Sequence, residues 1–83
     1  MKSTKRVPKE RVQFLIIFYN QYGEEIRTED TLAPDRWKAL ETAKRRGRNI
    51  NKRTTCPQEI AVTFTTVEKA TGLLLDSDWI EQK

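Results

Sequence analysis

The pattern of hydrophobic and polar positions predicts two strands, then one helix, then two or three further strands. Residues 12–19, VQFLIIFY, are rich in β-branched and aromatic side chains and are apolar at both alternating sets of positions, which predicts a central strand. Residues 20–23, NQYG, predict a turn in which Gly23 supplies a positive φ angle. Residues 24–28 predict a shorter second strand, and its single apolar side chain, Ile26, is typical of a sheet edge.

Residues 34–53, PDRWKALETAKRRGRNINKR, predict an amphipathic helix that runs out into a basic loop. Pro34 suits the first helical turn, and Asp35 lies near the positive end of the helix dipole. One stripe of the helix carries the side chains expected to pack on the sheet: Trp37, Leu40 and Ala43.

Gly47 decides how far this helix extends. As a C-cap residue, Gly47 would end the helix and leave residues 48–53 as a loop, and this is the interpretation that glycine favours. The alternative is a helix that continues through Gly47 and carries the cations of residues 48–53 on its surface.

The C-terminal part predicts a β-hairpin. Residues 60–67 alternate apolar and polar side chains, which indicates a strand with one buried face, and residues 68–72 predict the hairpin loop before a return strand at 73–75. Residues 76–78, Asp-Ser-Asp, predict a turn that delivers residues 79–80 as a fifth short strand or a closing flap. The fold class is therefore α+β: an antiparallel sheet of four or five strands, in sequence order ββαββ, with one helix packed on one face. The other face is expected to be solvated or to form a second binding surface.

The chain of 83 residues has room for one domain with a modest core. Residues 1–11 lack apolar periodicity and predict a flexible basic tail, and residues 12–83 predict the single folded domain. The longest apolar run, at 12–19, is far shorter than the ~20 residues of a membrane span, so no membrane partner is expected. One cysteine, Cys56, cannot form an internal disulfide, and this favours a cytoplasmic location.

Positive charge is concentrated in the predicted helix and its loop. Residues 34–53 carry eight cations and two carboxylates, a net charge of +6, whereas the whole chain carries +4, so the remainder is net acidic. Lys38, Arg45 and Lys52 recur every seven residues on the side opposite the apolar stripe, which predicts an outward row of cations. The candidate residues for binding nucleic acid or an acidic partner are Lys38, Arg45, Arg46, Arg48, Lys52 and Arg53 of this segment and Lys5 and Arg6 of the tail.

No catalytic or cofactor signature accompanies these cations. The chain has no histidine, a single cysteine, and serines only at Ser3 and Ser77, so neither a catalytic triad nor a zinc ligand set is expected. The acidic pairs at 24–25, 29–30 and 76–78 are expected to lie in turns. We therefore predict a non-enzymatic protein with no cofactor, no metal and no small-molecule substrate.

The span from residue 24 to residue 81 resembles small phage-encoded proteins, among them a type I-F anti-CRISPR inhibitor. These proteins place a short strand before an Ala-Lys-Arg helix and close with a Gly-Leu-x-Leu hairpin, an acidic turn and a tryptophan. The matching residues here are Ala43-Lys44-Arg45, Gly72-Leu73-Leu74-Leu75, Asp76, Asp78 and Trp79-Ile80. The resemblance implies a five-stranded antiparallel sheet with one helix, and a stoichiometric inhibitor that binds a CRISPR surveillance complex where target DNA enters. The chain departs from that pattern by its basic N-terminal tail and by its longer connector, GRNINKRTTCP, and the resemblance implies no particular functional residue.

Three functions follow as hypotheses. In the first, the cationic helix and tail bind nucleic acid, or a nucleic-acid-handling complex, by phosphate contact. In the second, the protein is an inhibitor whose cations occupy a site meant for DNA phosphates, or whose exposed sheet face docks on a CRISPR-type partner. In the third, it is a regulatory homodimer joined through the edge strand at 24–28.

Overall fold

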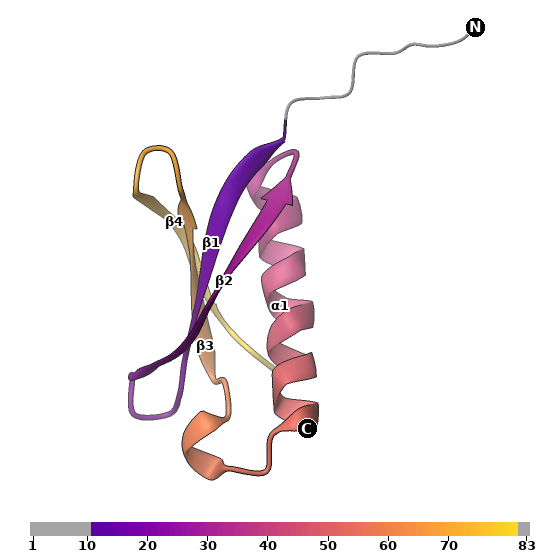
Figure 1. Cartoon of the computed structure of the whole chain (residues 1–83), viewed down its shortest axis with the longest axis vertical. Coiled ribbons are helices and arrows are strands. Elements are labelled where there is room, and N and C mark those ends of the chain that lie inside the picture. The colour runs from indigo at the N-terminus through magenta and orange to yellow at the C-terminus, as the bar shows by residue number, and fades with distance from the viewer. Residues whose placement is uncertain (1–10, 82–83) are drawn as a thin grey trace, which may run out of the picture.

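In a computed structural model that describes residues 11–81, one helix packs on one face of a four-stranded antiparallel sheet (Figure 1). The elements in chain order are β1 (Val12–Tyr19), β2 (Glu25–Ala33), α1 (Arg36–Arg53), a 3-10 turn (Pro57–Glu59), β3 (Thr63–Glu68) and β4 (Leu73–Trp79). The strands lie in the order β2-β1-β3-β4, so β1 is an inner strand and β2 an edge strand. This confirms the predicted α+β class and the order ββαββ.

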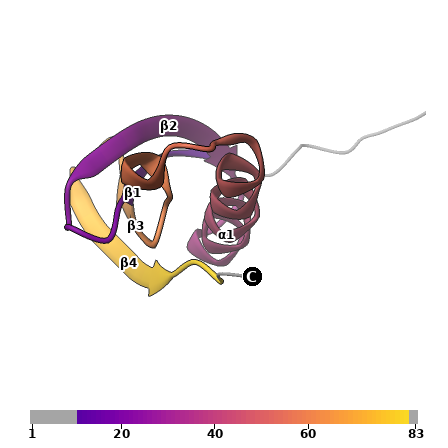
Figure 2. The same ribbon diagram turned by 90° about the horizontal axis from the view of Figure 1, so that it is seen from below.

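The register of the sheet decides which side chains meet the helix. Opposed residues of an antiparallel pair point to the same face, and Phe18 of β1 lies opposite Phe64 of β3. Both phenylalanines are fully buried, together with Ile16. The sheet curves around α1, as the view along the helix shows (Figure 2), so these large sheet side chains fill the space between the two layers. Phe14 of β1 is buried on the same face, whereas Tyr19 points to the other face and is half-buried.

The helix contributes only small side chains to the centre of this core. Ala39, Ala43 and Gly47 are its buried residues, and they let the helix backbone approach the sheet closely. Trp37, predicted to be a core residue, is 61% exposed instead. It precedes Ala43 by six residues, which places it about 120° away around the helix axis. Its ring lies against the Arg36 guanidinium, 5.2 Å from the ring centroid.

Gly47 does not end the helix. It lies in the middle of α1 without a positive φ angle, and the helix continues for six more residues to Arg53. Its tertiary contact explains this position, because a Cβ atom there would come within 2.8 Å of Cγ1 and 3.3 Å of Cγ2 of Ile80. Ile80, which follows β4, is itself buried against this part of the helix. The prediction of a C-cap was wrong because glycine here provides space and not a left-handed backbone.

The two edge strands are longer than the sequence pattern indicated. β2 extends from the predicted 24–28 to Ala33, and β4 runs without interruption from Leu73 to Trp79. The predicted turn at 76–78 and the separate fifth strand were therefore wrong within the described part of the chain. Asp76 and Asp78 lie opposite Thr66 and Phe64 in the ladder, so the strand is held by main-chain pairing that turn-forming residues do not reveal.

Asn20 fixes the turn between β1 and β2. Its buried amide oxygen accepts hydrogen bonds from the main-chain N–H groups of Tyr22 and Glu24, at 2.9 and 3.0 Å. Its Nδ2 donates to the carbonyl oxygen of Gln58 at 2.9 Å, which ties this turn to the 3-10 turn. Gly23 takes a φ of 78°, as predicted for this turn.

Candidate nucleic-acid interface

The candidate cations are carried by a helix with well-defined ends. Asp35 is the N-cap, and its Oδ1 accepts a hydrogen bond from the Lys38 N–H at 2.9 Å, while Pro34 lies just before the cap and not in the first turn. The N–H of Thr54 donates to the carbonyl oxygen of Ile50 at 3.0 Å and closes the last turn. With 18 residues, α1 is about 27 Å long, so it can hold cations in fixed positions along most of the domain.

Four exposed cations lie on the side of α1 that faces away from the sheet: Lys38, Arg45, Arg48 and Lys52. We call this set the outer row. A spacing of seven residues is close to two helical turns, which places Lys38, Arg45 and Lys52 one above another. Because the helix continues past Gly47, Arg48 and Lys52 belong to the same rigid surface as Arg45.

Most of the outer row has no carboxylate partner. The Lys38 Nζ lies 3.6 Å from Glu41 Oε1, one turn along the helix, where both side chains are largely exposed. Among residues 11–81, the side chains of Arg45, Arg48 and Lys52 form no ion pair and no hydrogen bond to another side chain or to the main chain. Their charges are available to an external anion.

Two helix cations on the side of α1 that faces β4 are already neutralised by carboxylates of that strand. Arg36 makes a two-pronged contact with Asp76, with Nη2 to Oδ1 at 3.1 Å and Nε to Oδ2 at 3.3 Å. Lys44 Nζ lies 3.1 Å from Asp78 Oδ2. The sequence pattern missed this role of Asp76 and Asp78 because it placed them in a turn. Alternation along a strand would have put both carboxylates on one face of the sheet, with Ser77 on the other face.

Arg46, one of the predicted contact residues, is also turned towards the sheet. Its Nη1 lies 3.1 Å from Glu29 Oε1 and donates to the carbonyl oxygen of Asp30 at 3.1 Å. Its side chain is half-buried. Arg46 therefore lies outside the outer row, and it fastens α1 to the edge strand β2.

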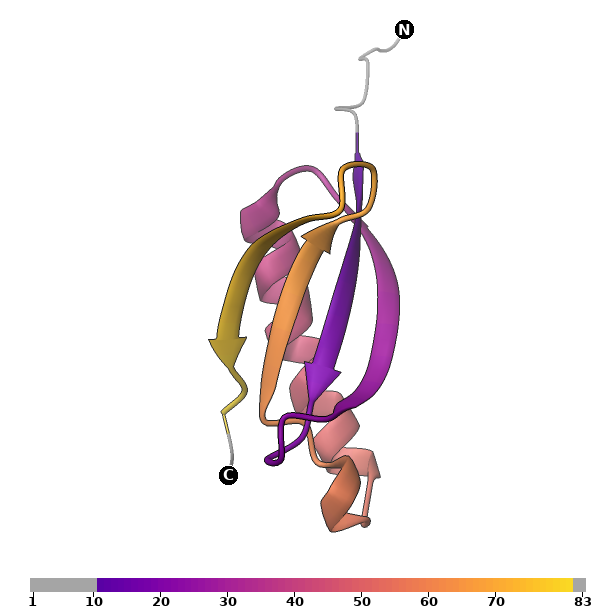
Figure 3. The same cartoon turned by 90° about the vertical axis from the view of Figure 1, so that its left-hand side faces the viewer.

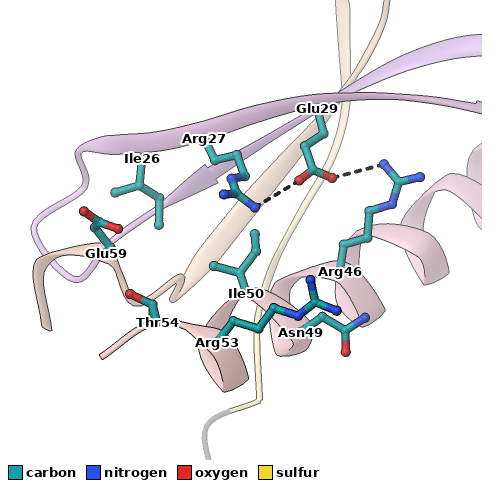
Figure 4. A pocket seen from close by; sticks show the side chains of 9 residues that line it. All are labelled: Ile26, Arg27, Glu29, Arg46, Asn49, Ile50, Arg53, Thr54 and Glu59. Atoms are coloured by element: carbon teal, nitrogen blue, oxygen red, sulfur yellow. Dashed lines mark hydrogen bonds and ion pairs between the residues drawn. The ribbon is translucent and has the colours of Figure 1, made fainter. Parts of the chain in front are cut away.

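Arg53, another predicted contact residue, borders a groove of about 470 Å³ between β2, the end of α1 and the 3-10 turn (Figure 4). Inside the groove, the Glu29 carboxylate lies between Arg27 and Arg46, at 3.4 and 3.1 Å from their Nη1 atoms. The lining residues are Ile26, Arg27, Glu29, Arg46, Asn49, Ile50, Arg53, Thr54 and Glu59. Arg53 thus extends the positive surface from the outer row around the flank of the helix. Lys5 and Arg6, the two candidates in the tail, lie outside the described residues.

Asp78 offers a direct check on the ion pairs beneath the helix. The hydrogen bond from the Trp79 N–H to Oδ1, and after it the contact with Lys44, hold the pKa of the Asp78 carboxyl below its ordinary value. A lowered pKa in the folded state stabilises the fold above the ordinary pKa of the carboxyl, and this contribution disappears as the pH falls through the lowered value.

The Lys44→Gln variant should raise the pKa of Asp78 only part of the way to its ordinary value, because the Trp79 hydrogen bond remains. Carbon-detected NMR titration of the carboxyl groups measures this directly. Lys38→Gln is the matched control, since Lys38 contacts Glu41 and not Asp78, and it should leave the Asp78 titration unchanged. An unchanged pKa in Lys44→Gln would contradict the contact.

Other site chemistry is sparse in the part of the chain that the structure describes. No group of three or more His, Cys, Asp or Glu side chains is placed to hold a metal ion there. The Cys56 thiol is half-buried and donates to Oε1 of Gln58 at 2.9 Å. Between residues 11 and 81, no helix is both long and apolar enough to cross a bilayer. No protein-family model, curated protein or solved structure matches the chain.

Proposed function

We propose that this protein binds nucleic acid, without reading its sequence, through the outer row of α1. The observation that carries the proposal is the division of the helix cations into two groups. Arg36, Lys44 and Arg46 are bonded to sheet carboxylates, whereas three of the four outer-row cations face solvent without a partner in the described residues. Cations that serve only to hold the helix on the sheet would belong to the first group.

The dimensions of the outer row suit a phosphate backbone. Lys38 and Lys52 are 14 positions apart in a continuous helix, which corresponds to about 21 Å along its axis. Each phosphate neutralised by a lysine or arginine releases condensed counterions, so four such contacts give a logarithmic salt dependence of about −3.6 for duplex and about −2.8 for single strands. Phosphate contacts of this kind carry no sequence information.

Trp37 supplies a second feature that favours single strands. Its exposed indole lies at the start of the same helix, with the Arg36 guanidinium near its ring. An exposed aromatic ring beside a row of cations is the combination by which proteins stack bases of single-stranded nucleic acid. We infer that single-stranded ligands gain stacking on Trp37 in addition to phosphate contacts.

A salt titration tests the proposal. Fluorescence anisotropy with labelled single-stranded and duplex oligonucleotides should show affinity falling about 100-fold between about 50 mM and 200 mM salt, because the counterions released at about four phosphate contacts gain less entropy as the salt concentration rises. The duplex and single-strand arms also separate the two ligand classes. Absence of binding at low salt to DNA or RNA would overturn the proposal, as would an affinity that does not change with salt.

The alternative in which the same cations fill a protein site for DNA phosphates is opposed by charge. Such a site is itself lined with lysine and arginine, so the outer row would be repelled by it. The outward cations therefore favour the nucleic acid as partner over the protein that handles it. An anti-CRISPR-type inhibitor of this shape would have to use another surface of the domain.

A further inference from the structure

The face of the sheet turned away from α1 is uncovered by any other part of residues 11–81. Figure 3 looks onto this face, with the helix behind the four strands. The register places one set of side chains on it, which we call the open face. Its apolar members are Leu15, Ile17 and Tyr19 of β1, Val67 of β3, Leu74 and Trp79 of β4 and Leu32 of β2.

These side chains form a patch larger than scattered surface residues would produce. Leu74 is 64% exposed and Trp79 is 69% exposed, and both lie at the β4 edge. The ladder continues from Leu74 to Val67 and on to Leu15 of β1, whereas Trp79 lies opposite Thr63, with Tyr19 of β1 on the far side of Thr63. A group of apolar side chains gathered on one uncovered face of a small domain marks an interaction surface.

Three hydroxyl groups of the open face already have hydrogen-bond partners within the chain. At its centre, the hydroxyls of Thr65 and Ser77 hydrogen bond to each other at 3.2 Å. At its β2 rim, the Thr28 hydroxyl donates to Glu25 Oε2 at 2.6 Å. A partner that covers this face would leave these three hydroxyls hydrogen-bonded, which lowers the free-energy cost of excluding water from it. The Gln13 amide and the hydroxyls of Thr63 and Tyr19 lie on the same face and would need partners in the second copy.

Charge indicates what kind of partner fits. The open face carries the carboxylates of Glu25 and Asp30 at its rim and the ammonium of Lys69, which lies 3.8 Å from Asp30 Oδ1. The open face therefore lacks the free cations that nucleic acid requires. Two open faces can approach each other with little electrostatic repulsion, although the whole chain has a net charge of +4. An apolar centre with a polar rim is the usual anatomy of a protein interface.

The area agrees with a weak self-association. Eight residues of β1 at about 3.3 Å each, across four strands about 4.8 Å apart, give a footprint of about 500 Å² per copy. Two copies would bury about 1,000 Å², the lower limit for a specific interface. Edge pairing through β2 is less suitable, because that strand is rich in charged side chains and bulged against β1.

We propose that two copies of this chain associate face to face through the open face, with Leu74 and Trp79 of each copy packed against the sheet of the other. Sheets packed in this way lie about 10 Å apart with their strands nearly aligned. The helices then lie on the two outer sides of the pair, and both outer rows remain exposed. Because its buried area is small, the association is weak, and the dimer forms only at high protein concentration.

Sedimentation equilibrium of the full chain tests this proposal. The wild type should pass from 9.8 kDa to twice that mass as its concentration rises from micromolar to millimolar. Leu74→Ser combined with Trp79→Ser should raise the dissociation constant by about tenfold or more, since it removes the two most exposed apolar anchors. Both side chains are exposed in the single copy, so the variant should keep its fold, and circular dichroism checks this.

The matched control is Leu73→Ser combined with Trp37→Ser, which removes the same two side-chain types at similar exposure from outside the open face. It should leave the dissociation constant within about twofold of the wild type. A wild type that remains at 9.8 kDa overturns the proposal. A dimer that the open-face substitutions do not weaken overturns it as well, and so does a dimer that the control variant weakens equally. In either case the contact between the copies would lie at an edge strand instead.

Discussion

Replacing Arg45, Arg48 and Lys52 together with glutamine is expected to weaken nucleic-acid binding by about 100-fold or more at 0.1 M salt. Each lost phosphate contact removes about 0.7 to 0.9 from the salt slope, so the slope should fall by two to three units. These three cations have no partner in residues 11–81, and glutamine is an adequate helix former. The unfolding temperature should therefore stay close to that of the wild type while the affinity falls.

A second triple variant tests whether binding depends on where the cations lie on the helix or only on how many there are. Arg36→Gln, Lys44→Gln and Arg46→Gln remove the same number of charges from the same helix, but from side chains that already contact Asp76, Asp78 and Glu29. Its affinity for nucleic acid should fall by less than about tenfold, because only the long-range electrostatic attraction of the whole protein is reduced. Equal losses in the two variants would mean that net charge, and not the outer row, carries binding.

Gly47→Val is expected to lower the free energy of unfolding by about 3 kcal/mol or more. The new side chain would overlap Ile80, whose Cγ1 already lies 2.8 Å from the position of a Cβ atom at residue 47. Ile80 is buried and cannot swing into solvent without opening the core. Urea unfolding measures the loss, and Asn49→Val on the exposed side of the same helix controls for the helix propensity of valine, with an expected cost below about 1 kcal/mol.

A double-mutant cycle identifies the cause of this loss. Ile80→Val alone should cost about 1 kcal/mol because it removes one buried methyl group. In a Gly47→Ala background it should cost less or stabilise the protein, because the Cδ1 atom that meets the alanine methyl is gone. Additive effects of the two substitutions would contradict the close contact between α1 and Ile80.

The sequence was sufficient for the class of fold and for the position of most elements, because these depend on local periodicity. The apolar run at 12–19 predicted the inner strand β1, and the isolated Ile26 correctly indicated that β2 lies at an edge. The seven-residue spacing of Lys38, Arg45 and Lys52 correctly placed them on the outward side of the helix. A period of two or of 3.6 residues is set by the backbone and is therefore visible in the sequence.

Only the tertiary structure decided which of these positions have partners. Gly47 continues the helix because Ile80, 33 residues further on, needs the space that a side chain would fill. Trp37 is exposed because Ala39 and not Trp37 continues the face defined by Ala43. Asp76 and Asp78 belong to a strand, where they neutralise Arg36 and Lys44 across the layer interface. The division of one basic helix into bonded and available cations, and the uncovered apolar face of the sheet, arise from contacts between distant segments, and no local pattern contains them.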